Sequence, residues 1–222
     1  MKRVPEPELM AEHEQAEAYA NADFEEPHSR VIELFDAEFP ASGIRGSILD
    51  LGCGPGDVTF RFGRRFPEAA ITAVDGSAVM IRLANERKAR EGEVADRIEF
   101  IEGCIPGVRI ARVSYDLIIS TSFLHHLHRP EVLWQTVAEY AGRGTRIFVV
   151  DLLRPESRAE AEELVNQYSA DEPEILQRDF YNSLLAAFRP EEIEQQLVST
   201  GLGELSIRRV SDRHVIVFGV RR

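Results

Sequence analysis

The sequence has few cysteines, because Cys53 and Cys104 are the only two among its 222 residues. Neither belongs to a C-x-x-C pair, so the sequence indicates neither a cysteine-based zinc site nor a disulfide framework. No apolar run approaches the roughly 18 residues of a membrane span. The acidic segment 1–26 lacks the basic and apolar regions of a secretory signal. These absences predict a cytoplasmic chain with reduced thiols and no membrane association.

Basic residues are also scarce, with 26 Lys and Arg against 38 Asp and Glu and a net charge of -12. The excess acid lies in two segments: residues 1–40 carry 11 acidic and 3 basic residues, and residues 151–200 carry 12 and 4. A protein that binds a phosphate backbone needs a concentrated Lys/Arg face. We therefore expect no nucleic-acid partner. The length suits one domain, and the absence of internal repeats and linkers favours a single domain over residues 1–222.

Short apolar segments alternate with helix-forming segments from residue 47 onward. They predict strands at 47–52, 70–75, 97–103, 115–122 and 146–153, and helices at 56–66, 77–91 and 130–141. Nearly continuous apolar strands joined by helices are typical of a parallel sheet with both faces covered. Two further strands, 205–210 and 214–222, are separated by a short turn and predict an antiparallel hairpin. The expected fold is an α/β, doubly wound, mostly parallel seven-stranded sheet with a C-terminal antiparallel hairpin.

Helix-forming segments flank this expected core on both sides. Residues 8–24 and 28–38 predict two N-terminal helices, and residues 156–169, 172–186 and 190–200 predict three late ones. We therefore divide the chain into an N-terminal helical cover (1–40), a core (47–153), a second helical cover (154–200) and a closing hairpin (201–222).

The most informative segment is DLGCGPGD at residues 50–57, directly between the first strand and the next helix. A strand that turns at once into a helix needs residues that tolerate positive φ, and a ligand near the backbone needs the absence of Cβ. Gly52, Gly54 and Gly56 meet both needs. The second strand ends at Asp75, where a carboxylate can accept hydrogen bonds from both hydroxyls of a ribose. Together these features predict a nucleoside-containing ligand.

The details favour one nucleoside ligand. The spacing is G-x-G-x-G rather than the G-x-G-x-x-G of dinucleotide sites, and carboxylates at Asp50 and Asp57 would repel a pyrophosphate. They suit a ligand with an ammonium and a sulfonium group. The segment ILDLGCGPG at 48–56 resembles the first motif of the class I (Rossmann-like) S-adenosylmethionine-dependent methyltransferases. The alternative is that the segment is only a tight turn from strand to helix.

This resemblance extends over about residues 47–153 and implies S-adenosylmethionine as cofactor. It places Gly52 and Gly54 beside the methionine moiety and Asp50 near its amino group. The resemblance makes Asp75 the acid that binds the ribose hydroxyls. It also puts Gly76, Ser77 and Met80 along the adenine. Members commonly have an Asp after the glycine of the third motif, but here Cys104 follows Gly103. We therefore expect a backbone amide, that of Cys104 or Ile105, at the adenine.

The exit of the fourth strand, STSFLHH at 120–126, resembles that of small-molecule methyltransferases of the quinone-biosynthesis type. Residues from Ser120 to His126 are expected to border the methyl group. His125 or His126 is then a candidate general base, with helix capping or packing as the alternative. No metal is expected, because adjacent histidines diverge on most backbones and no H-E-x-x-H motif is present. The [DNS]-P-P-[YFW] signature of nucleic-acid base methylation is also absent.

The two cover segments supply candidate acceptor-binding residues: Tyr19, Arg154, Tyr181 and Asn182. Guanidinium, phenol and amide groups suit a small polar or carboxylate-bearing acceptor. The sequence thus predicts in-line methyl transfer to an O, N or S atom of a small molecule, with S-adenosylhomocysteine as product. Two alternatives remain: an RNA- or protein-directed methyltransferase, and a protein that binds the cofactor without transferring methyl. The oligomeric state is expected to be monomer or homodimer.

Overall fold

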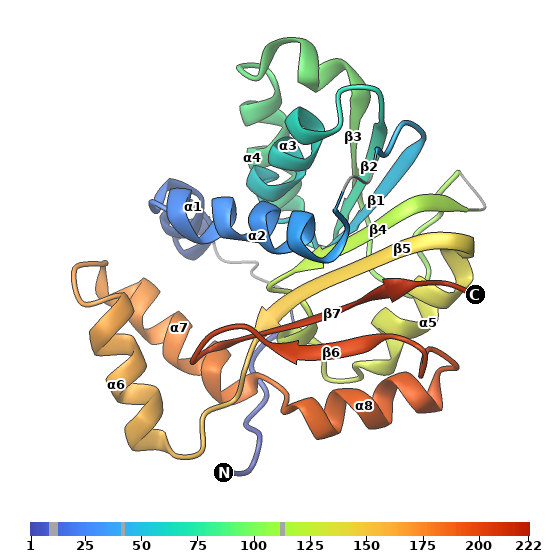
Figure 1. Cartoon of the computed structure of the whole chain (residues 1–222). Helices are drawn as coiled ribbons and strands as arrows, with labels where there is room; N and C mark the ends of the chain where they lie inside the picture. The colour runs from blue at the N-terminus through green and yellow to red at the C-terminus, as the bar shows by residue number, and fades with distance from the viewer. Residues whose placement is uncertain (9–12, 41–42, 112–113) are drawn as a thin grey trace.

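The computed structural model describes residues 1–8, 13–40, 43–111 and 114–222 (Figure 1). Seven strands form one sheet in the order β3, β2, β1, β4, β5, β7, β6. Their bounds are β1 Ser47–Leu51, β2 Ala70–Asp75, β3 Ile98–Glu102, β4 Tyr115–Thr121, β5 Ala141–Leu152, β6 Ser206–Arg209 and β7 His214–Val220. The predicted doubly wound α/β fold is confirmed.

The strands β1 to β5 run parallel, whereas β7 pairs antiparallel with both β5 and β6. All five residues of β1 are buried, because a central parallel strand is covered on both faces. The carboxyl ends of the parallel strands meet at one edge, which is where doubly wound sheets bind their ligands. The antiparallel pairing of β6 with β7 confirms the predicted C-terminal hairpin.

Helices cover both faces of the sheet. Their bounds are α1 His13–Asn21, α2 Glu25–Glu38, α3 Asp57–Arg65, α4 Ala78–Lys88, α5 Glu131–Tyr140, α6 Arg158–Tyr168, α7 Glu174–Ala186 and α8 Pro190–Ser199, with 3-10 turns η1 Gly92–Arg97 and η2 Leu124–His126. Among the residues described, no helix has both the length and the apolar character needed to cross a bilayer.

Side chains of the strands alternate between two buried layers, as the two-residue period of a strand requires. Leu49 and Ile118 belong to the layer that packs against α5 and α8. Ile48 and Phe148 belong to the opposite layer, which packs against α2 and α3. The strands whose carboxyl ends form the expected ligand-binding edge therefore also pack against the helices on both faces.

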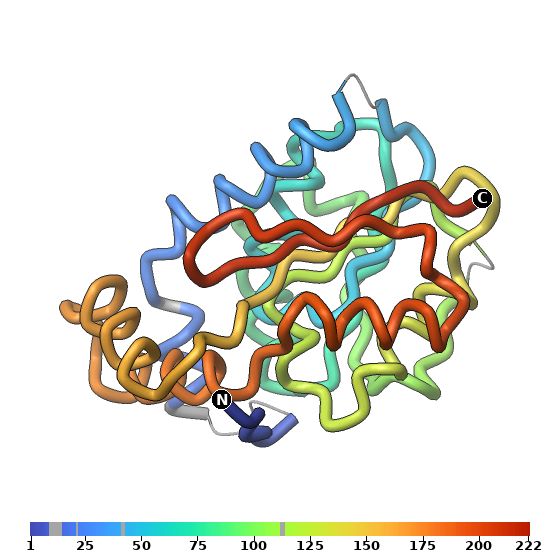
Figure 2. Tube along the Cα trace, turned by 60° about the horizontal axis from the view of Figure 1, so that its bottom comes forward, coloured from blue at the N-terminus to red at the C-terminus, as the bar shows by residue number. Residues whose placement is uncertain are grey.

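Parts of both cover segments meet beyond the carboxyl ends of the parallel strands, where Figures 1 and 2 show α1, α6 and α7 gathered. The Gln15 side chain on α1 donates a hydrogen bond to Asp179 on α7 at 2.8 Å. Residues 1–8, which we call the N-terminal strap, reach the same helix, since the Val4 amide donates to the Leu185 carbonyl at 3.0 Å.

Three details differ from the predicted elements. β5 begins at Ala141 rather than 146, because the glycine-containing segment that resembles a turn continues the strand. The first described helix begins at His13, and residues 9–12 of the helix predicted at 8–24 lie outside the described residues. The segment after β4 forms the 3-10 turn η2, which determines how the two adjacent histidines are placed.

Candidate active site

The loop from β1 to α3 turns at three glycines. Gly52, Gly54 and Gly56 have φ of 77°, 53° and 84°, in the region that disfavours residues with a Cβ. The amides of Gly52 and Cys53 donate hydrogen bonds to the Val74 carbonyl at 2.8 and 3.0 Å, which fixes the loop to the end of β2. The predicted positive φ at these glycines is confirmed.

The three glycines have different surroundings. A Cβ on Gly52 would lie 2.2 Å from the Phe123 ring, and one on Gly56 would lie 2.8 Å from the Phe100 ring. Within the described residues, no atom lies within 4 Å of the Cβ position of Gly54. Gly54 is therefore the glycine of this loop with room for a ligand, while Gly52 and Gly56 also accommodate aromatic rings of the protein.

Asp75 lies at the end of β2 and joins two loops. One carboxylate oxygen accepts a hydrogen bond from the Gly54 amide at 2.9 Å, and the other accepts one from the Ser77 amide at 2.8 Å. Burial raises the pKa of this carboxyl group, which the two amide donors oppose. A carboxylate has about four acceptor sites. Asp75 can therefore keep both loop contacts and still accept hydrogen bonds from a ligand.

The predicted adenine-side residues flank Asp75. Ser77 begins α4, where its hydroxyl accepts a hydrogen bond from the Met80 amide at 3.3 Å, and Met80 is buried. Gly76, between Asp75 and Ser77, is half-buried. The structure therefore brings these three residues together next to the ribose acid predicted from sequence.

The loop after β3 reaches Asp75 from the other side. The Gly103 amide donates a hydrogen bond to the Asp75 carbonyl at 2.9 Å. Cys104 is exposed with a free thiol, and Ile105 is half-buried against the core. These three residues thus lie beside the predicted cofactor position, with no acidic side chain at residue 104.

Asp50 on β1 is almost completely buried, and one of its oxygens accepts a hydrogen bond from the Thr59 hydroxyl at 2.6 Å. Burial, together with the charge of Asp75, raises the pKa of Asp50 to about 7, although the Thr59 hydrogen bond opposes the shift. Asp50 therefore changes charge near neutral pH, and a nearby ammonium group would favour its ionised form.

The premise that Asp57 presents a free carboxylate to the ligand is wrong. Its oxygens contact His28 at 2.7 Å, Arg61 at 2.7 Å and Arg87. Burial alone would raise the pKa of Asp57, but hydrogen bonds with His28 and Arg61 and the positive charge of Arg87 hold it well below its ordinary value. The Asp57 carboxylate thus contacts residues of three helices and ties α2 to the start of α3.

His125 is buried on η2, with its Nδ1 2.7 Å from the Asp151 carboxylate. Asp151 ends the apolar part of β5 and also accepts hydrogen bonds from the amides of Phe123 and Leu124 at 2.9 and 2.8 Å. Burial opposes protonation of His125, but the negative charge of Asp151 outweighs it and raises the histidine pKa. The pair fixes the ring with Nε2 directed toward the strap.

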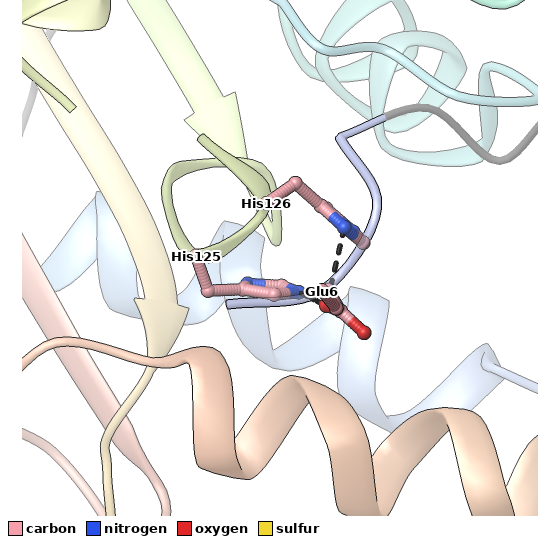
Figure 3. Close-up of side chains that lie close together, drawn as sticks. All are labelled: Glu6, His125 and His126. Atoms are coloured by element: carbon pink, nitrogen blue, oxygen red, sulfur yellow. Dashed lines mark ion pairs between the residues drawn. The ribbon is translucent and has the colours of Figure 1, made fainter. Parts of the chain in front are cut away.

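His126 and Glu6 complete this cluster. Glu6 Oε1 lies 3.2 Å from Nδ1 of His126 and 3.6 Å from Nε2 of His125, and the two rings lie 4.2 Å apart (Figure 3). Burial and the charge of His125 lower the pKa of His126 to about 3, so its ring is neutral. The premise that adjacent histidines diverge is wrong here, because the 3-10 turn presents both rings to the same carboxylate.

Two further predicted residues lie near the glycine loop. Tyr19 on α1 is partly buried, and its pKa is raised to about 12 by burial and by the charges of Asp57 and Asp75. Its ring packs against Phe24, with the ring centres 4.9 Å apart. Ser120 is buried in β4, and its hydroxyl donates a hydrogen bond to the Leu51 carbonyl at 2.7 Å, which joins the two central strands.

The remaining predicted acceptor-binding residues lie around α7. The Arg154 guanidinium is buried and donates hydrogen bonds to the Ala187 carbonyl at 3.2 Å and to Glu192 at 2.7 Å. Its charge is thus already paired within the protein. Tyr181 and Asn182 are half-buried on α7, with Tyr181 against the apolar contact of α6 and α7.

Sequence reasoning missed Glu6 and Asp151. Glu6 lies between two prolines in the segment VPEPE, which indicates an extended chain but names no partner. Asp151 is an acid within an apolar strand, and a buried acid needs a hydrogen-bonding partner. The acid at position 151 in an apolar strand was visible in the sequence, whereas the contact of Glu6 with the histidines depends on the folded chain.

Known proteins resemble the central part of the chain. Residues 48–144 match the methyltransferase domain family. The chain is 39% identical over 110 residues to a malonyl-[acyl-carrier protein] O-methyltransferase of Priestia megaterium, a match that covers 48% of this chain and 35% of that protein. It is 42% identical over 64 residues to a trans-aconitate 2-methyltransferase of Rhodopseudomonas palustris, covering 29% and 25%. The chain thus matches about a third or less of the length of these relatives.

The fold as a whole resembles a solved structure of an S-adenosylmethionine-dependent methyltransferase from Aquifex aeolicus. The TM-score is 0.67 at 14% identity, over 93% of this chain and 97% of that chain. The matched sequence region contains the glycine loop, Asp75 and both histidines of η2. Residues 48–144 thus match a methyltransferase domain, and the chain as a whole has the fold of a solved S-adenosylmethionine-dependent methyltransferase.

Proposed function

We propose that the chain binds S-adenosylmethionine and transfers its methyl group to an O, N or S atom of a small-molecule acceptor, leaving S-adenosylhomocysteine. The observation that carries the proposal is the cradle of Gly54, Asp75 and Ser77: open space at one glycine beside a carboxylate held by two backbone amides. A carboxylate at this position of a doubly wound sheet suits the paired hydroxyls of a ribose. The family match over residues 48–144 supports the same cofactor.

In this proposal the cofactor lies across the carboxyl ends of β1 and β2. Its ribose hydroxyls donate hydrogen bonds to Asp75, and its adenine lies along Gly76, Ser77 and Met80 toward the loop at 103–105. Its methionine moiety passes Gly54, with the ammonium group near Asp50. The charge near the ligand comes from Asp50 and Asp75, since Asp57 is already paired within the protein.

The acceptor is proposed to lie between η2 and the covers α1 and α7. Tyr19 and Tyr181 with Asn182 offer phenol and amide groups there, while the paired Arg154 is the weakest of the four predicted contacts. Catalysis of in-line transfer rests on proximity and alignment in a closed site. His125 and His126 border this space, and either ring accepts the acceptor's proton if a base is used.

The names of the relatives support acceptors outside nucleic acids, since they are a malonyl-[acyl-carrier protein] O-methyltransferase and a trans-aconitate 2-methyltransferase. Neither relative is named as a quinone-biosynthesis enzyme, so the resemblance to that branch stays a prediction. The excess of acidic residues in both covers also supports a small acceptor rather than RNA.

Calorimetric titration with S-adenosylmethionine and S-adenosylhomocysteine tests the cofactor proposal. We expect saturable binding of one molecule of either ligand per chain, and no comparable binding of a nicotinamide dinucleotide as the control. A folded protein that binds neither sulfur ligand would refute the proposal. Preference for the dinucleotide would instead indicate a dehydrogenase.

Methyl-labelled cofactor tests the acceptor class. The protein is incubated with labelled S-adenosylmethionine and a cell extract separated into small-molecule, RNA and protein fractions. We expect enzyme-dependent label in the small-molecule fraction, and Asp75→Ala should remove it. Label confined to the RNA or protein fraction would refute the small-molecule assignment.

A further inference from the structure

The Glu6, His125 and His126 cluster places three possible metal-ligand atoms close together. The atoms are Oε1 of Glu6, Nε2 of His125 and Nδ1 of His126, and all lie within 4.8 Å of one another. They come from the N-terminal strap and from η2, so the cluster forms only when the strap lies across the turn (Figure 3).

The contacts around the cluster leave one ring nitrogen of each histidine directed at its centre. Nδ1 of His125 hydrogen-bonds with Asp151 at 2.7 Å, so Nε2 is the ring atom that faces Glu6. Nδ1 of His126 is buried and has no hydrogen-bond partner in the described part of the chain. Two ring nitrogens and a carboxylate oxygen therefore face one another without a hydrogen bond between them.

Two of the three separations between the ligand atoms suit one small cation at the centre, and the two ring nitrogens lie within 4.8 Å of each other. In a tetrahedral site with zinc bonds of about 2.0–2.1 Å, neighbouring ligand atoms lie about 3.3 Å apart. Glu6 Oε1 lies 3.2 Å from Nδ1 of His126 and 3.6 Å from Nε2 of His125.

The surrounding groups are those that orient metal ligands. A ligating histidine usually donates its other N–H to a carboxylate or a carbonyl, as His125 does to Asp151 at 2.7 Å. The carboxylate ligand is itself fixed, because the Ser183 hydroxyl donates to Glu6 Oε1 at 2.9 Å. Hydrogen bonds with neighbouring residues thus fix the orientation of two of the three possible ligands, His125 and Glu6.

We propose that Glu6, His125 and His126 bind one divalent transition-metal ion of the Zn²⁺ class. Two imidazoles and one carboxylate form a ligand set of catalytic zinc sites, in which a fourth position is open to water or substrate. Soft thiolates are absent from the cluster and hard oxygen ligands are too few for Ca²⁺ or Mg²⁺. The open position would face an oxygen, nitrogen or sulfur atom of a bound acceptor.

This inference goes beyond the proposed methyl transfer and changes the role of the histidines. A ring nitrogen that binds a metal ion cannot also accept a proton, so His125 and His126 would position the acceptor through the metal rather than act as general bases. Metal binding needs no S-adenosylmethionine. A test without the cofactor therefore succeeds or fails independently of the proposed function.

The test is titration of the metal-stripped, untagged full chain with Zn²⁺ in the absence of cofactor, followed by calorimetry in competition with a chelator. We expect one equivalent to bind. Glu6→Gln and His126→Ala should each lower the affinity by about a hundredfold or more, since even outer partners of metal ligands change affinity by 10- to 100-fold. Substitution by Co²⁺ should give the intense visible absorption of a tetrahedral site in the wild-type protein alone.

Glu8→Gln is the matched control, because Glu8 lies on the same strap but accepts a hydrogen bond from the His128 amide outside the cluster. It should bind Zn²⁺ as the wild-type protein does, and thermal unfolding should show all variants folded. No stoichiometric binding by the wild-type protein would overturn the proposal and indicate that a proton occupies the cluster. An affinity that is equal in the wild type, Glu6→Gln and His126→Ala would overturn it as well.

Discussion

At the scale of single residues, Asp75 connects the fold to the proposed ligand. Its carboxylate accepts hydrogen bonds from Gly54 and Ser77, so it orders two loops before any ribose hydroxyl binds. A pre-ordered carboxylate loses little conformational freedom on binding. This explains why an acid at the end of β2, which the sequence already indicated, is a good partner for a ribose.

Asp75→Ala is expected to weaken binding of S-adenosylmethionine by about 1–3 kcal/mol, because charge-assisted hydrogen bonds to the ribose are lost. Calorimetry measures the change. Asp171→Asn, an exposed substitution beyond α6, serves as the control and should bind normally. Equal affinity in Asp75→Ala and the wild type would contradict the ribose assignment.

Asp50 is expected to give the proposed cofactor binding a pH dependence. Its pKa is raised by burial to about 7, so the folded protein retains this proton at pH values where an exposed Asp has lost it. The ammonium group of S-adenosylmethionine favours the ionised carboxylate. Binding should therefore release a proton below about pH 7, and affinity should rise as pH increases toward 7 and then level off.

Calorimetry in buffers of different ionisation enthalpy measures this release, because the observed heat then varies with the buffer. Asp50→Asn keeps the side-chain size and removes the titrating group. The variant should show a heat that does not vary with the buffer near pH 6. The same buffer dependence in both proteins would assign the proton to another group.

The features that the structure confirms have local signatures in the sequence, and those that the sequence missed do not. The positive φ of Gly54 and the place of Asp75 at the end of β2 follow from the spacing of the loop and the strand, while their cofactor-binding roles stay predictions. Glu6 meets the histidines only because the strap folds back onto η2. Arg3 of the same strap hydrogen-bonds with His125, which lies 122 residues away in the sequence. The carboxylate of Asp57 was expected to be free for the same reason, since its partners include His28, which lies on another helix.

At the scale of elements, the strands were predictable because a buried parallel strand is apolar throughout, and β2 has the predicted bounds of 70 and 75. The start of β5 was not predictable, because Gly142 and Gly144 resemble a turn. In the structure the pairing with β4 shifts register across them, from Ala141 opposite Tyr115 to Arg146 opposite Leu117. The η2 turn was missed too, since three residues carry no periodic signal. That turn decides the geometry of both histidines.

The glycine loop as an element predicts different effects for two similar substitutions. Gly54→Ala places a Cβ at positive φ in open space, which should cost about 1–2 kcal/mol of unfolding free energy and block cofactor binding. Gly56→Ala has the same strain and also meets the Phe100 ring, so overpacking should add about 1–3 kcal/mol. Urea unfolding and calorimetry separate the two effects. Normal cofactor affinity in Gly54→Ala would refute the proposal that the cofactor passes close to Gly54.

The docking of α2 depends on Phe35, which is fully buried. Its ring packs edge-on against Phe62, Phe66 and Phe148, with centroids 5.3, 5.6 and 5.4 Å away. Phe35→Ala should lower the free energy of unfolding by about 3–5 kcal/mol through lost burial and a cavity. Val198→Ala is the control, because Val198 is 67% exposed and should change stability by less than about 0.5 kcal/mol. Equal denaturant midpoints would contradict this packing argument.

At the scale of the whole molecule, the two acidic cover segments converge on one edge of the sheet, and Arg3 is a cation that joins them. Its guanidinium donates to the carbonyls of His125 and Leu127 at 2.8 and 3.0 Å, to the Ala186 carbonyl at 2.5 Å, and lies 4.0 Å from the centre of the Phe188 ring. The strap is therefore connected to η2 and to the end of α7 through a single side chain.

Arg3→Ala should consequently release the strap while the sheet stays folded. Hydrogen bonds from a charged donor contribute about 1.5–3 kcal/mol, so local opening of the strap should become roughly tenfold or more frequent. Hydrogen exchange at the Val4 amide, which donates to the Leu185 carbonyl at 3.0 Å, reports that opening directly. Arg3→Lys keeps the charge without the planar set of donors and should give an intermediate rate. Unchanged exchange at Val4 in Arg3→Ala would show that apolar contacts, and not Arg3, hold the strap over the site.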